Sequence, residues 1–470
     1  MSPTFDAIVI GGGVAGLSAA KELLAQGRRV CLLEAAASLG GRIRTVRSSG
    51  WPTPLELGAE FVHARPDFFA RALQSARVVT GAQTGTHVMA ERGRLEHAEA
   101  LWQAALARVE EMPDVDESYA AAVRKPGSRR RPDARVLELA DAYVQGFNAA
   151  DSDRISARAL SLQSRADLLY DGGRIERVLG GYDRLVDDLA RPLAAHDEAL
   201  LLRTRAVTID WHGREVRVHC RQGLGEARAT YRGRAVVITV PLSLLKQDQP
   251  GHLRFSPSLP RPTRAAIATI AMGSVTKLIL RFRLRFWQDA RALGLSALSA
   301  HKLAGLSFLH TPAGPVPTWW VPRPLDVPVL VGWAAGPAAA SFAQAHQGDK
   351  MRAVRAGVSG LARALGCAAA PLLAIVEDAE LVDWSVMPFC HGAYSWLPVG
   401  ALAAPDVLAR PIRGRLFFAG EATHTHHQLG TVHGAMETGL RAAHEVARVL
   451  GRPIEAAQPL LFPRDLRPMQ

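Results

Sequence analysis

Cysteine is scarce in this chain, with four widely separated residues in 470 and no C-x-x-C pair. This spacing argues against a disulfide framework and against a cysteine zinc site, and it is compatible with a reducing compartment. No apolar run reaches the roughly 18–20 residues that a membrane-spanning helix needs, so we expect no membrane anchor. An apolar segment that begins by residue 7 leaves no room for a cleavable signal peptide, and we expect a cytoplasmic protein.

Lysine is also scarce, because six lysines stand against fifty arginines in a chain whose formal net charge is +12. Together with the abundant alanine, this bias is typical of a GC-rich bacterial genome. The one tight basic cluster, at 128–132, lies among proline and glycine and predicts a solvated loop rather than a nucleic-acid site. His424, His426 and His427 lack paired carboxylates and a second spaced histidine motif, so we expect no metal site.

Glycine is plentiful directly after the first apolar segment. The run at 7–10 has the β-branched composition of a buried parallel strand, and 11–16 fits G-x-G-x-x-G before a helix-forming stretch at 17–24. The first glycine permits a tight turn, the second lets backbone approach a pyrophosphate, and the third lets the helix pack on the strand. The segment predicts a dinucleotide site formed by Gly11, Gly13, Val14, Ala15 and Gly16.

A second strand, expected at 29–33, ends at Glu34, whose carboxylate would accept hydrogen bonds from ribose hydroxyls and disfavour a 2′-phosphate. The stretch 39–45 then brings two glycines and two arginines close to the first glycine turn. We therefore expect Gly41 and Arg42 at a second pyrophosphate contact, where Arg42 would donate charge-assisted hydrogen bonds. Strand, glycines, helix, strand and acid in register make this a specific prediction of a dinucleotide site.

Residues 34–45 and 57–63 resemble two consecutive elements of the flavin monoamine and polyamine oxidase superfamily. The resemblance implies FAD as the cofactor, with Gly58, Ala59 and Glu60 passing near the flavin ring. It also matches His63 with a histidine near the substrate channel of animal polyamine oxidases. No second G-x-G-x-x-G follows downstream, so we expect the electrons to come from the organic substrate rather than from NAD(P)H.

Two further motifs carry the chemistry that the resemblance implies. The motif M-G-S-V-T-K ends in Lys277, where the superfamily has a lysine bridged by water to flavin N5, and an ammonium there would stabilise negative charge. The motif W-S-V-M-P-F-C-H-G-A-Y-S implies that Trp384 contacts the cofactor and that Tyr394 steers the amine nitrogen. Ala393 stands where enzymes with covalent flavin have cysteine, so we expect FAD to be bound non-covalently.

The C-terminal segment 416–442 resembles the part of the superfamily that closes over the flavin. Gly420 and Glu421 would approach the ribityl and pyrophosphate groups. Thr431 and Val432 would begin the last helix, whose backbone N–H groups can stabilise the N1–C2=O2 region of reduced flavin. Thr431 stands where monoamine oxidases have a second tyrosine, and the motif T-V-H-G-A resembles polyamine oxidases and lysine-specific histone demethylases.

The expected fold class is α/β, with a Rossmann-like FAD-binding domain interleaved with a substrate domain of antiparallel sheet flanked by helices. Helices are expected over most of 80–177, and strands at 277–282 and 329–333. The resemblance implies that a hairpin at 207–218 lines the adenine through the backbone of Val207. We expect FAD-binding segments at 1–79, 178–260 and 388–451, substrate-domain segments at 80–177 and 261–387, and a C-terminal tail at 452–470.

Together with the resemblance, these residues predict a flavin-dependent amine oxidase. The hydride on the carbon next to the amine nitrogen would pass to flavin N5, the imine would hydrolyse to an aldehyde plus an amine or ammonia, and O2 would reoxidise the flavin to give hydrogen peroxide. The expected partners are O2 and a small amine, such as a polyamine or another primary or secondary amine. No nucleic acid and no membrane are expected, and a homodimer stays open. An L-amino-acid oxidase and a flavin-bound interaction protein without turnover stay open as alternatives.

Overall fold

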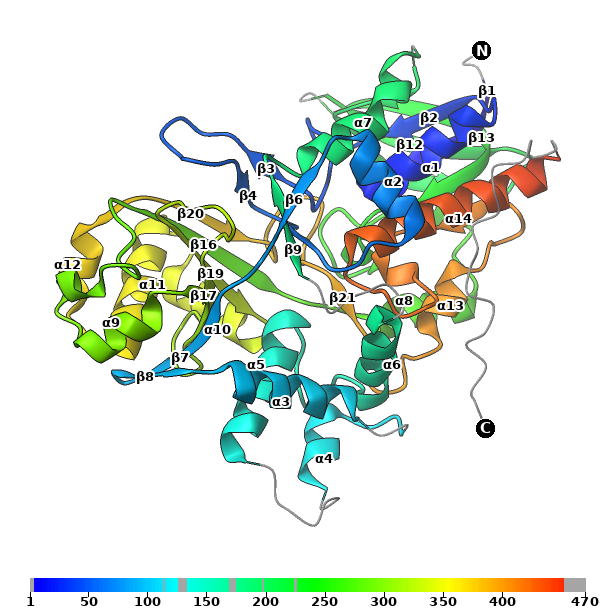
Figure 1. Cartoon of the computed structure of the whole chain (residues 1–470). Helices are drawn as coiled ribbons and strands as arrows, with labels where there is room; N and C mark the ends of the chain where they lie inside the picture. The colour runs from blue at the N-terminus through cyan, green and yellow to red at the C-terminus, as the bar shows by residue number, and fades with distance from the viewer. Residues whose placement is uncertain are drawn as a thin grey trace.

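The computed structural model describes residues 4–112, 115–125, 133–168, 175–196, 198–223 and 226–451. The basic cluster at 128–132 and the tail at 452–470 lie outside the described residues. Two large β-sheets lie at opposite ends of the molecule, and a group of helices covers the region between them (Figure 1). The space enclosed by these three parts becomes the candidate site.

The first sheet is built around β1 (Thr4–Ile10) and β13 (Ala227–Ile238), which pair in parallel. Because helices cover both faces, β1 and β2 (Val30–Leu33) are almost entirely apolar and buried, as the sequence predicts. The other strands are β10 (Leu200–Leu201), β11 (Thr204–Asp210), β12 (Val216–Gln222), β14 (Arg254–Ser256) and β22 (Leu416–Phe418). Their order is β10-β2-β1-β13-β12-β11-β14, and β22 pairs with β13 as well.

The helices of this first part are α1 (Val14–Ala25), α2 (Asp67–Ser75), α7 (Asp183–Ala194), α8 (Arg261–Thr269), α13 (Ala404–Ala409) and α14 (Val432–Leu450). On one face of the sheet, α1 packs against α7 and α14 (Figure 1). Gly439 permits the close approach of α14, since a Cβ there would lie 2.2 Å from the carbonyl oxygen of Ala15. Apolar residues of α8 and α13 pack with Ile8 and Ile10 on the opposite face.

The second sheet has the strands β7 (Thr86–Glu91), β8 (Arg94–His97), β16 (Val275–Phe282), β17 (Leu306–His310), β18 (Thr318–Trp320), β19 (Val329–Ala335) and β20 (Val376–Asp383). Their order is β20-β16-β19-β18-β17-β7-β8. The expected antiparallel arrangement is confirmed except for β17 and β7, which are parallel. Helices are predicted over most of 80–177, and this prediction is wrong at β7 and β8, which are strands. Arg92 and Gly93 adopt φ of 49° and 85°, and this two-residue turn favours a hairpin.

Two groups of helices flank this sheet. One group packs on it and consists of α9 (Ala297–Leu303), α10 (Pro337–His346), α11 (Lys350–Leu365) and α12 (Ala369–Ala374). The other group covers the region between the sheets and consists of α3 (Glu99–Glu110), α4 (Tyr119–Arg124), α5 (Ala134–Phe147) and α6 (Ala157–Leu168). The helix predicted at 135–147 is α5 and is confirmed.

Small sheets connect the two ends of the molecule. Strand β9 (Glu176–Leu179) pairs with both β5 (Phe61–Val62) and β6 (Val79–Ala82), and β3 (Thr45–Val46) pairs with β4 (Leu55–Glu56). A third small sheet joins β15 (Ala271–Met272) to β21 (Ser395–Trp396). In the part of the chain that the structure describes, every helix is too short or too polar to cross a bilayer. Within the same ranges, no group of three His, Cys, Asp or Glu side chains could hold a metal ion.

Candidate active site

A continuous cavity of about 750 Å³ runs from the glycine turn after β1 to the second sheet and to helices α3, α5 and α6. Most of the predicted site residues line it. They are Gly11, Gly13, Val14, Ala15, Glu34, Gly41, Arg42, Gly58, Ala59, Glu60, His63, Trp384, Tyr394, Gly420, Glu421, Thr431 and Val432. Gly16, Val207 and Lys277 are not among the lining residues.

The glycine turn between β1 and α1 leaves one backbone position open to the cavity. Gly11 has a φ of +111°, which favours glycine. A Cβ at Gly16 would lie 1.9 Å from the carbonyl oxygen of Gly11, so the contact between helix and strand has no room for a side chain. Gly13 differs, because the nearest neighbour of an added Cβ is the carbonyl oxygen of Gly40 at 3.9 Å. A group in the cavity can therefore approach the backbone at Gly13.

Glu34 fixes the glycine turn to the end of β2. Its carboxylate accepts hydrogen bonds from the backbone N–H of Gly12 at 2.6 Å and of Ala36 at 2.7 Å. Burial raises the pKa of this carboxyl, while the two backbone donors act in the opposite direction. Each carboxylate oxygen still has a second lone pair that can accept a further hydrogen bond.

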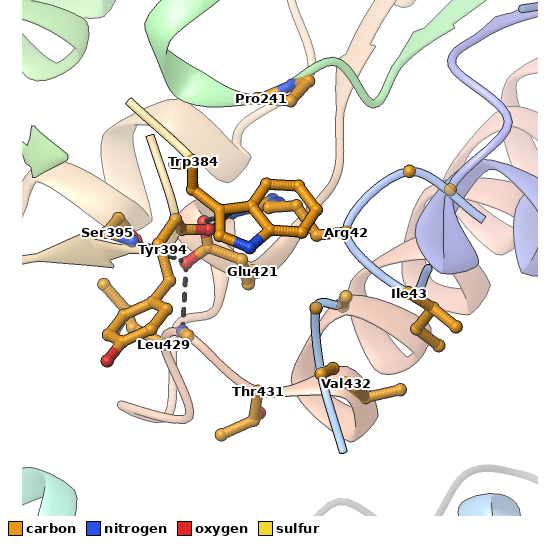
Figure 2. A pocket seen from close by; sticks show the side chains of 18 of the residues that line it. Arg42, Ile43, Pro241, Trp384, Tyr394, Ser395, Glu421, Leu429, Thr431 and Val432 are labelled. Atoms are coloured by element: carbon orange, nitrogen blue, oxygen red, sulfur yellow. Dashed lines mark hydrogen bonds and ion pairs between the residues drawn. The ribbon is translucent and has the colours of Figure 1, made fainter. Parts of the chain in front are cut away.

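Glu421 joins three distant segments of the chain at the cavity wall (Figure 2). Its carboxylate accepts from the Arg42 guanidinium at 2.8 Å, from the Ser395 hydroxyl at 2.5 Å and from the Gly430 backbone N–H at 3.0 Å. Burial alone would raise the pKa of Glu421, but Arg42 and these other donors hold it below its usual range. Arg42 also donates to the carbonyl oxygen of Ala393 at 2.8 Å. The sequence did not predict this pairing of Arg42 with Glu421.

Trp384, Tyr394 and Thr431 surround one region of the cavity (Figure 2). The indole N–H of Trp384 donates to the carbonyl oxygen of Leu57 at 3.0 Å, and the phenol of Tyr394 donates to the carbonyl oxygen of Phe147 at 2.8 Å. Both rings are thus fixed in position. Thr431 is the N-cap of α14, and its hydroxyl accepts from the backbone N–H of Gly434. The start of the last helix at Val432 agrees with the sequence prediction.

Lys277 is completely buried behind the cavity wall. Its ammonium donates to the Glu60 carboxylate, to the carbonyl oxygen of Glu56 at 2.6 Å and to that of Gly58 at 3.3 Å. It also lies 5.8 Å from the ring centre of Trp320, which lines the cavity. The ammonium therefore has protein partners for all three of its hydrogens, and the expected water bridge from Lys277 stays a prediction.

Of the predicted site residues His63 and Val207, only His63 lines the cavity. His63 lines the cavity and is exposed, with its ring centre 6.0 Å from that of Phe61. Val207 is absent from the lining residues, whereas its neighbours Arg205 and Ala206 belong to them. A β-bulge between Ala206 and Thr208 shifts the register of β11 at this point. A β-bulge cannot be predicted from the alternation of residues along a strand. The sequence therefore pointed to Val207, although its neighbours Arg205 and Ala206 line the cavity.

Sequence reasoning missed the aromatic end of the cavity. Trp102, Tyr143 and Phe147 come from α3 and α5, and Trp102 stacks on His310 with 4.7 Å between ring centres. Nε2 of His310 lies 3.1 Å from Nδ1 of His87, and His87 lines the cavity. Burial lowers the pKa of His87 to about 4, so this histidine is neutral at physiological pH. No recognised motif falls on these helices, and only an apolar helical pattern could have pointed to them.

Two carboxylates also line this end of the cavity. Glu110 ends α3 and is exposed, and Asp167 lies in the last turn of α6. Burial raises the pKa of Asp167 to about 6, although a hydrogen bond of 2.8 Å from the side chain of Gln428 opposes this rise. Arg42, Arg44 and Arg205 are the arginines among the described lining residues, and none of them lies on α3, α5 or α6.

Comparisons with known proteins give a consistent picture. The family model described as "Flavin containing amine oxidoreductase" matches residues 14–447. Polyamine oxidase 3 of Oryza sativa subsp. japonica is 30% identical over 96% of this chain and 91% of its own length. Lysine-specific histone demethylase 1 homolog 3 of Arabidopsis thaliana is 29% identical over 94% of this chain. The match spans only 30% of that plant demethylase.

Solved structures confirm the expected α/β fold. Putrescine oxidase bound to putrescine has a TM-score of 0.75 at 20% identity, covering 95% of this chain and 99% of that one. Cyclohexylamine oxidase from Brevibacterium oxydans has a TM-score of 0.74 at 21% identity, covering 96% of this chain and 100% of that one. At such identities the likeness establishes the fold alone.

Proposed function

Because this chain belongs to the flavin-containing amine oxidoreductase family, a family of flavin-dependent amine oxidases, we propose that it binds FAD non-covalently and oxidises a small primary or secondary amine. The observation that carries the proposal is the continuity of the cavity from the glycine turn to the aromatic end. A dinucleotide bound along the first part would have its reactive ring beside the second part. We also propose the interleaved domains expected from the sequence, because β1, β13 and β22 come from separate segments and share one sheet.

The residues along the cavity fit the parts of FAD. The open backbone at Gly13, at the N-terminus of α1, suits the pyrophosphate, and Arg42 adds a positive charge. Glu34 suits the ribose hydroxyls. The N-terminus of α14 at Val432 suits the electron-rich edge of the flavin ring. When bound, FAD supplies the acceptor for the substrate's hydride and the group that O2 reoxidises, with hydrogen peroxide as the product.

The aromatic residues orient the substrate. The phenol of Tyr394 is committed to the carbonyl oxygen of Phe147, so the ring of Tyr394 is what remains to contact an amine. Burial raises the pKa of Tyr394, and the phenol therefore stays neutral. Trp384 and Phe147 enclose the same region with apolar surface, which excludes water from the reacting carbon. The amine reacts in its neutral form, so the rate of substrate oxidation should rise with pH.

The charges at the aromatic end favour a substrate with a second ammonium group, such as a polyamine. Glu110 and Asp167 are carboxylates, and none of the arginines among the described lining residues lies on the three helices that carry them or their aromatic neighbours. An L-amino-acid substrate would instead need an arginine there to pair with its carboxylate. The charges thus support a polyamine substrate over an L-amino-acid substrate.

A hydrogen-peroxide assay of the purified protein tests the proposal. We expect peroxide from diamines and polyamines, less from a monoamine of the same carbon length, and none from amino acids. Asp167→Asn should raise the KM for a diamine by at least about tenfold, because hydrogen bonds to charged groups contribute about 1.5–3 kcal/mol and tenfold corresponds to about 1.4 kcal/mol. The KM for the monoamine should not change, and Glu111→Gln, next to Glu110 but outside the cavity, is the matched control. Peroxide from amino acids alone would overturn the amine assignment.

A further inference from the structure

A buried group of three charged side chains, Lys277, Arg177 and Glu60, lies directly behind the cavity wall. Lys277 comes from β16, Arg177 from β9, and Glu60 from the segment that leads into β5. The exposed fractions of their side chains are 0% for Lys277, 5% for Glu60 and 6% for Arg177. Of the three, Glu60 lines the cavity.

Glu60 lies between the two cations and uses one carboxylate oxygen for each. Oε1 accepts from the Arg177 guanidinium at 2.9 Å, and Oε2 pairs with the Lys277 ammonium. The same ammonium also donates to the carbonyl oxygens of Glu56 and Gly58. Glu56, Gly58 and Glu60 belong to one short segment, of which Gly58 and Glu60 line the cavity, so a single lysine bonds to alternate residues of this segment.

The charge on Lys277 depends on this carboxylate for a physical reason. Burial disfavours the ammonium and lowers the pKa of Lys277, and the nearby Arg177 acts in the same direction. Glu60 opposes both effects by its charge and by its hydrogen bond. The Glu56 carboxyl is the other ionisable group facing the cluster, and its pKa is raised to about 7 by burial. The rings of Trp320 and Trp333, from β18 and β19, carry no charge.

We propose that Glu60 is a positioning residue that keeps the buried Lys277 ammonium protonated and fixed behind the cavity wall. The positive charge that Lys277 presents to a flavin then exists only while Glu60 is intact. This inference rests on the proposed binding of FAD in the cavity. It also explains how a lysine without access to the cavity can act there, since its charge acts through the tryptophan rings and the backbone of residues 56–60.

A double-mutant cycle on the FAD-loaded enzyme tests the dependence. The four proteins are the wild type, Lys277→Met, Glu60→Gln and the double variant, and the midpoint potential of bound FAD is measured by equilibration with a redox dye. Lys277→Met should lower the potential in the wild-type background, because removal of a positive charge disfavours reduced, anionic flavin. In the Glu60→Gln background, where the lysine is neutral, the same substitution should leave the potential unchanged.

Acidification supplies a second readout that a purely structural role would not affect. In Glu60→Gln, lowering the pH should protonate Lys277 again, so the effect of Lys277→Met on the potential should return. Because the charges of Lys277 and Glu60 both act on the pKa of Glu56, the cycle is repeated in a Glu56→Gln background. Flavin reoxidation by O2 should follow the same pattern, with about a hundredfold loss from Lys277→Met only when Glu60 is present.

The outcomes separate the inference from the proposed function. Equal effects of Lys277→Met in both backgrounds would show that the ammonium does not need Glu60 and would overturn the inference. A wild-type protein that binds no flavin would instead overturn the proposed function. If Glu60→Gln does not load FAD, Glu60→Asp takes its place. Because Asp keeps a carboxylate, Lys277→Met should still shift the flavin potential in part in this background. A Glu60→Asp enzyme whose flavin potential does not respond at all to Lys277→Met would also count against the inference.

Discussion

Four buried glutamates, Glu34, Glu56, Glu60 and Glu421, organise the backbone and cations around the cavity. Glu34 holds the glycine turn, Glu421 joins three segments, and Glu60 pairs with two cations. Glu56 accepts from the backbone N–H of Tyr182 and from the hydroxyl of Thr45, each at 2.8 Å. Burying a carboxylate is costly unless it is hydrogen-bonded, so each of these side chains has a defined set of partners.

Glu56 should make folding stability depend on pH. Burial raises its pKa from 4.5 to about 7, so between these values the folded protein holds a proton that the unfolded chain has released. Stability therefore falls as the pH rises through this window, by about 3 kcal/mol in total at about 1.4 kcal/mol per pH unit. Glu56→Gln resembles the protonated form and should lose less stability than the wild type between pH 5 and pH 8. Urea unfolding at the two pH values measures the difference.

The matched control for Glu56 is an exposed glutamate. Glu111→Gln should lose the same stability as the wild type over the same interval, because Glu111 is exposed. Identical pH dependence in Glu56→Gln and the wild type would show that the carboxyl ionises in the folded protein much as it does in the unfolded chain.

At the scale of elements, the glycine turn between β1 and α1 separates a folding role from a binding role. A Cβ at Gly16 would collide with the carbonyl oxygen of Gly11, whereas a Cβ at Gly13 would enter open cavity space. Gly13 also has a φ of −79°, which alanine adopts without strain. The two positions lie in the same turn, but packing of the helix on the strand limits Gly16, whereas the space for a bound group limits Gly13.

This contrast predicts opposite phenotypes for two alanine substitutions. Gly16→Ala should destabilise the apoprotein by about 1–3 kcal/mol, because the helix must move away from the strand. Gly13→Ala should leave the apoprotein as stable as the wild type but weaken FAD binding by at least about tenfold. Urea unfolding and titration of flavin fluorescence measure the two quantities. Wild-type FAD affinity in Gly13→Ala would exclude this turn from the cofactor site.

The predictable elements are those set by local constraints. The strand, glycine turn, helix and second strand at the N-terminus follow from continuous apolar runs and from the conformations that glycine permits. The partner of Arg42 is Glu421, 379 residues away, and no local pattern could reveal the pairing. The burial of Lys277 is similar, since it depends on Glu60 and Arg177 from other elements. Long-range contacts of this kind decide the details of the site.

At the scale of the whole molecule, the cavity is walled by segments between residues 10 and 435 of the chain. Cys390 is the cysteine among the described lining residues, and burial raises the pKa of its thiol. A thiol of raised pKa is a poor nucleophile, and Ala393 offers none at the position before Tyr394. We therefore expect that a group bound in the cavity has no covalent bond to a cysteine of the described cavity wall.

Acid precipitation of the yellow protein should release all of its FAD into the supernatant. Folded apoprotein, prepared separately, should gain stability when FAD is added, by about 2.7 kcal/mol at a hundredfold excess of FAD over Kd, because the cofactor binds only the folded chain. Thermal unfolding with and without FAD measures this gain. Flavin that stays on the precipitate, and that Cys390→Ser removes, would show a covalent link at Cys390.

The central place of β13 has a consequence for how the protein is made. β13 pairs with β1 from the start of the chain and with β22 near its end, and α14 then covers α1. During synthesis β1 can pair early with β2, but its other neighbour, β13, leaves the ribosome more than two hundred residues later, and the helix α14 that covers α1 leaves later still. The nascent N-terminal segment exposes apolar surface for most of this time. We therefore expect production of the protein in the cell to depend on chaperones that bind the incomplete chain until translation ends.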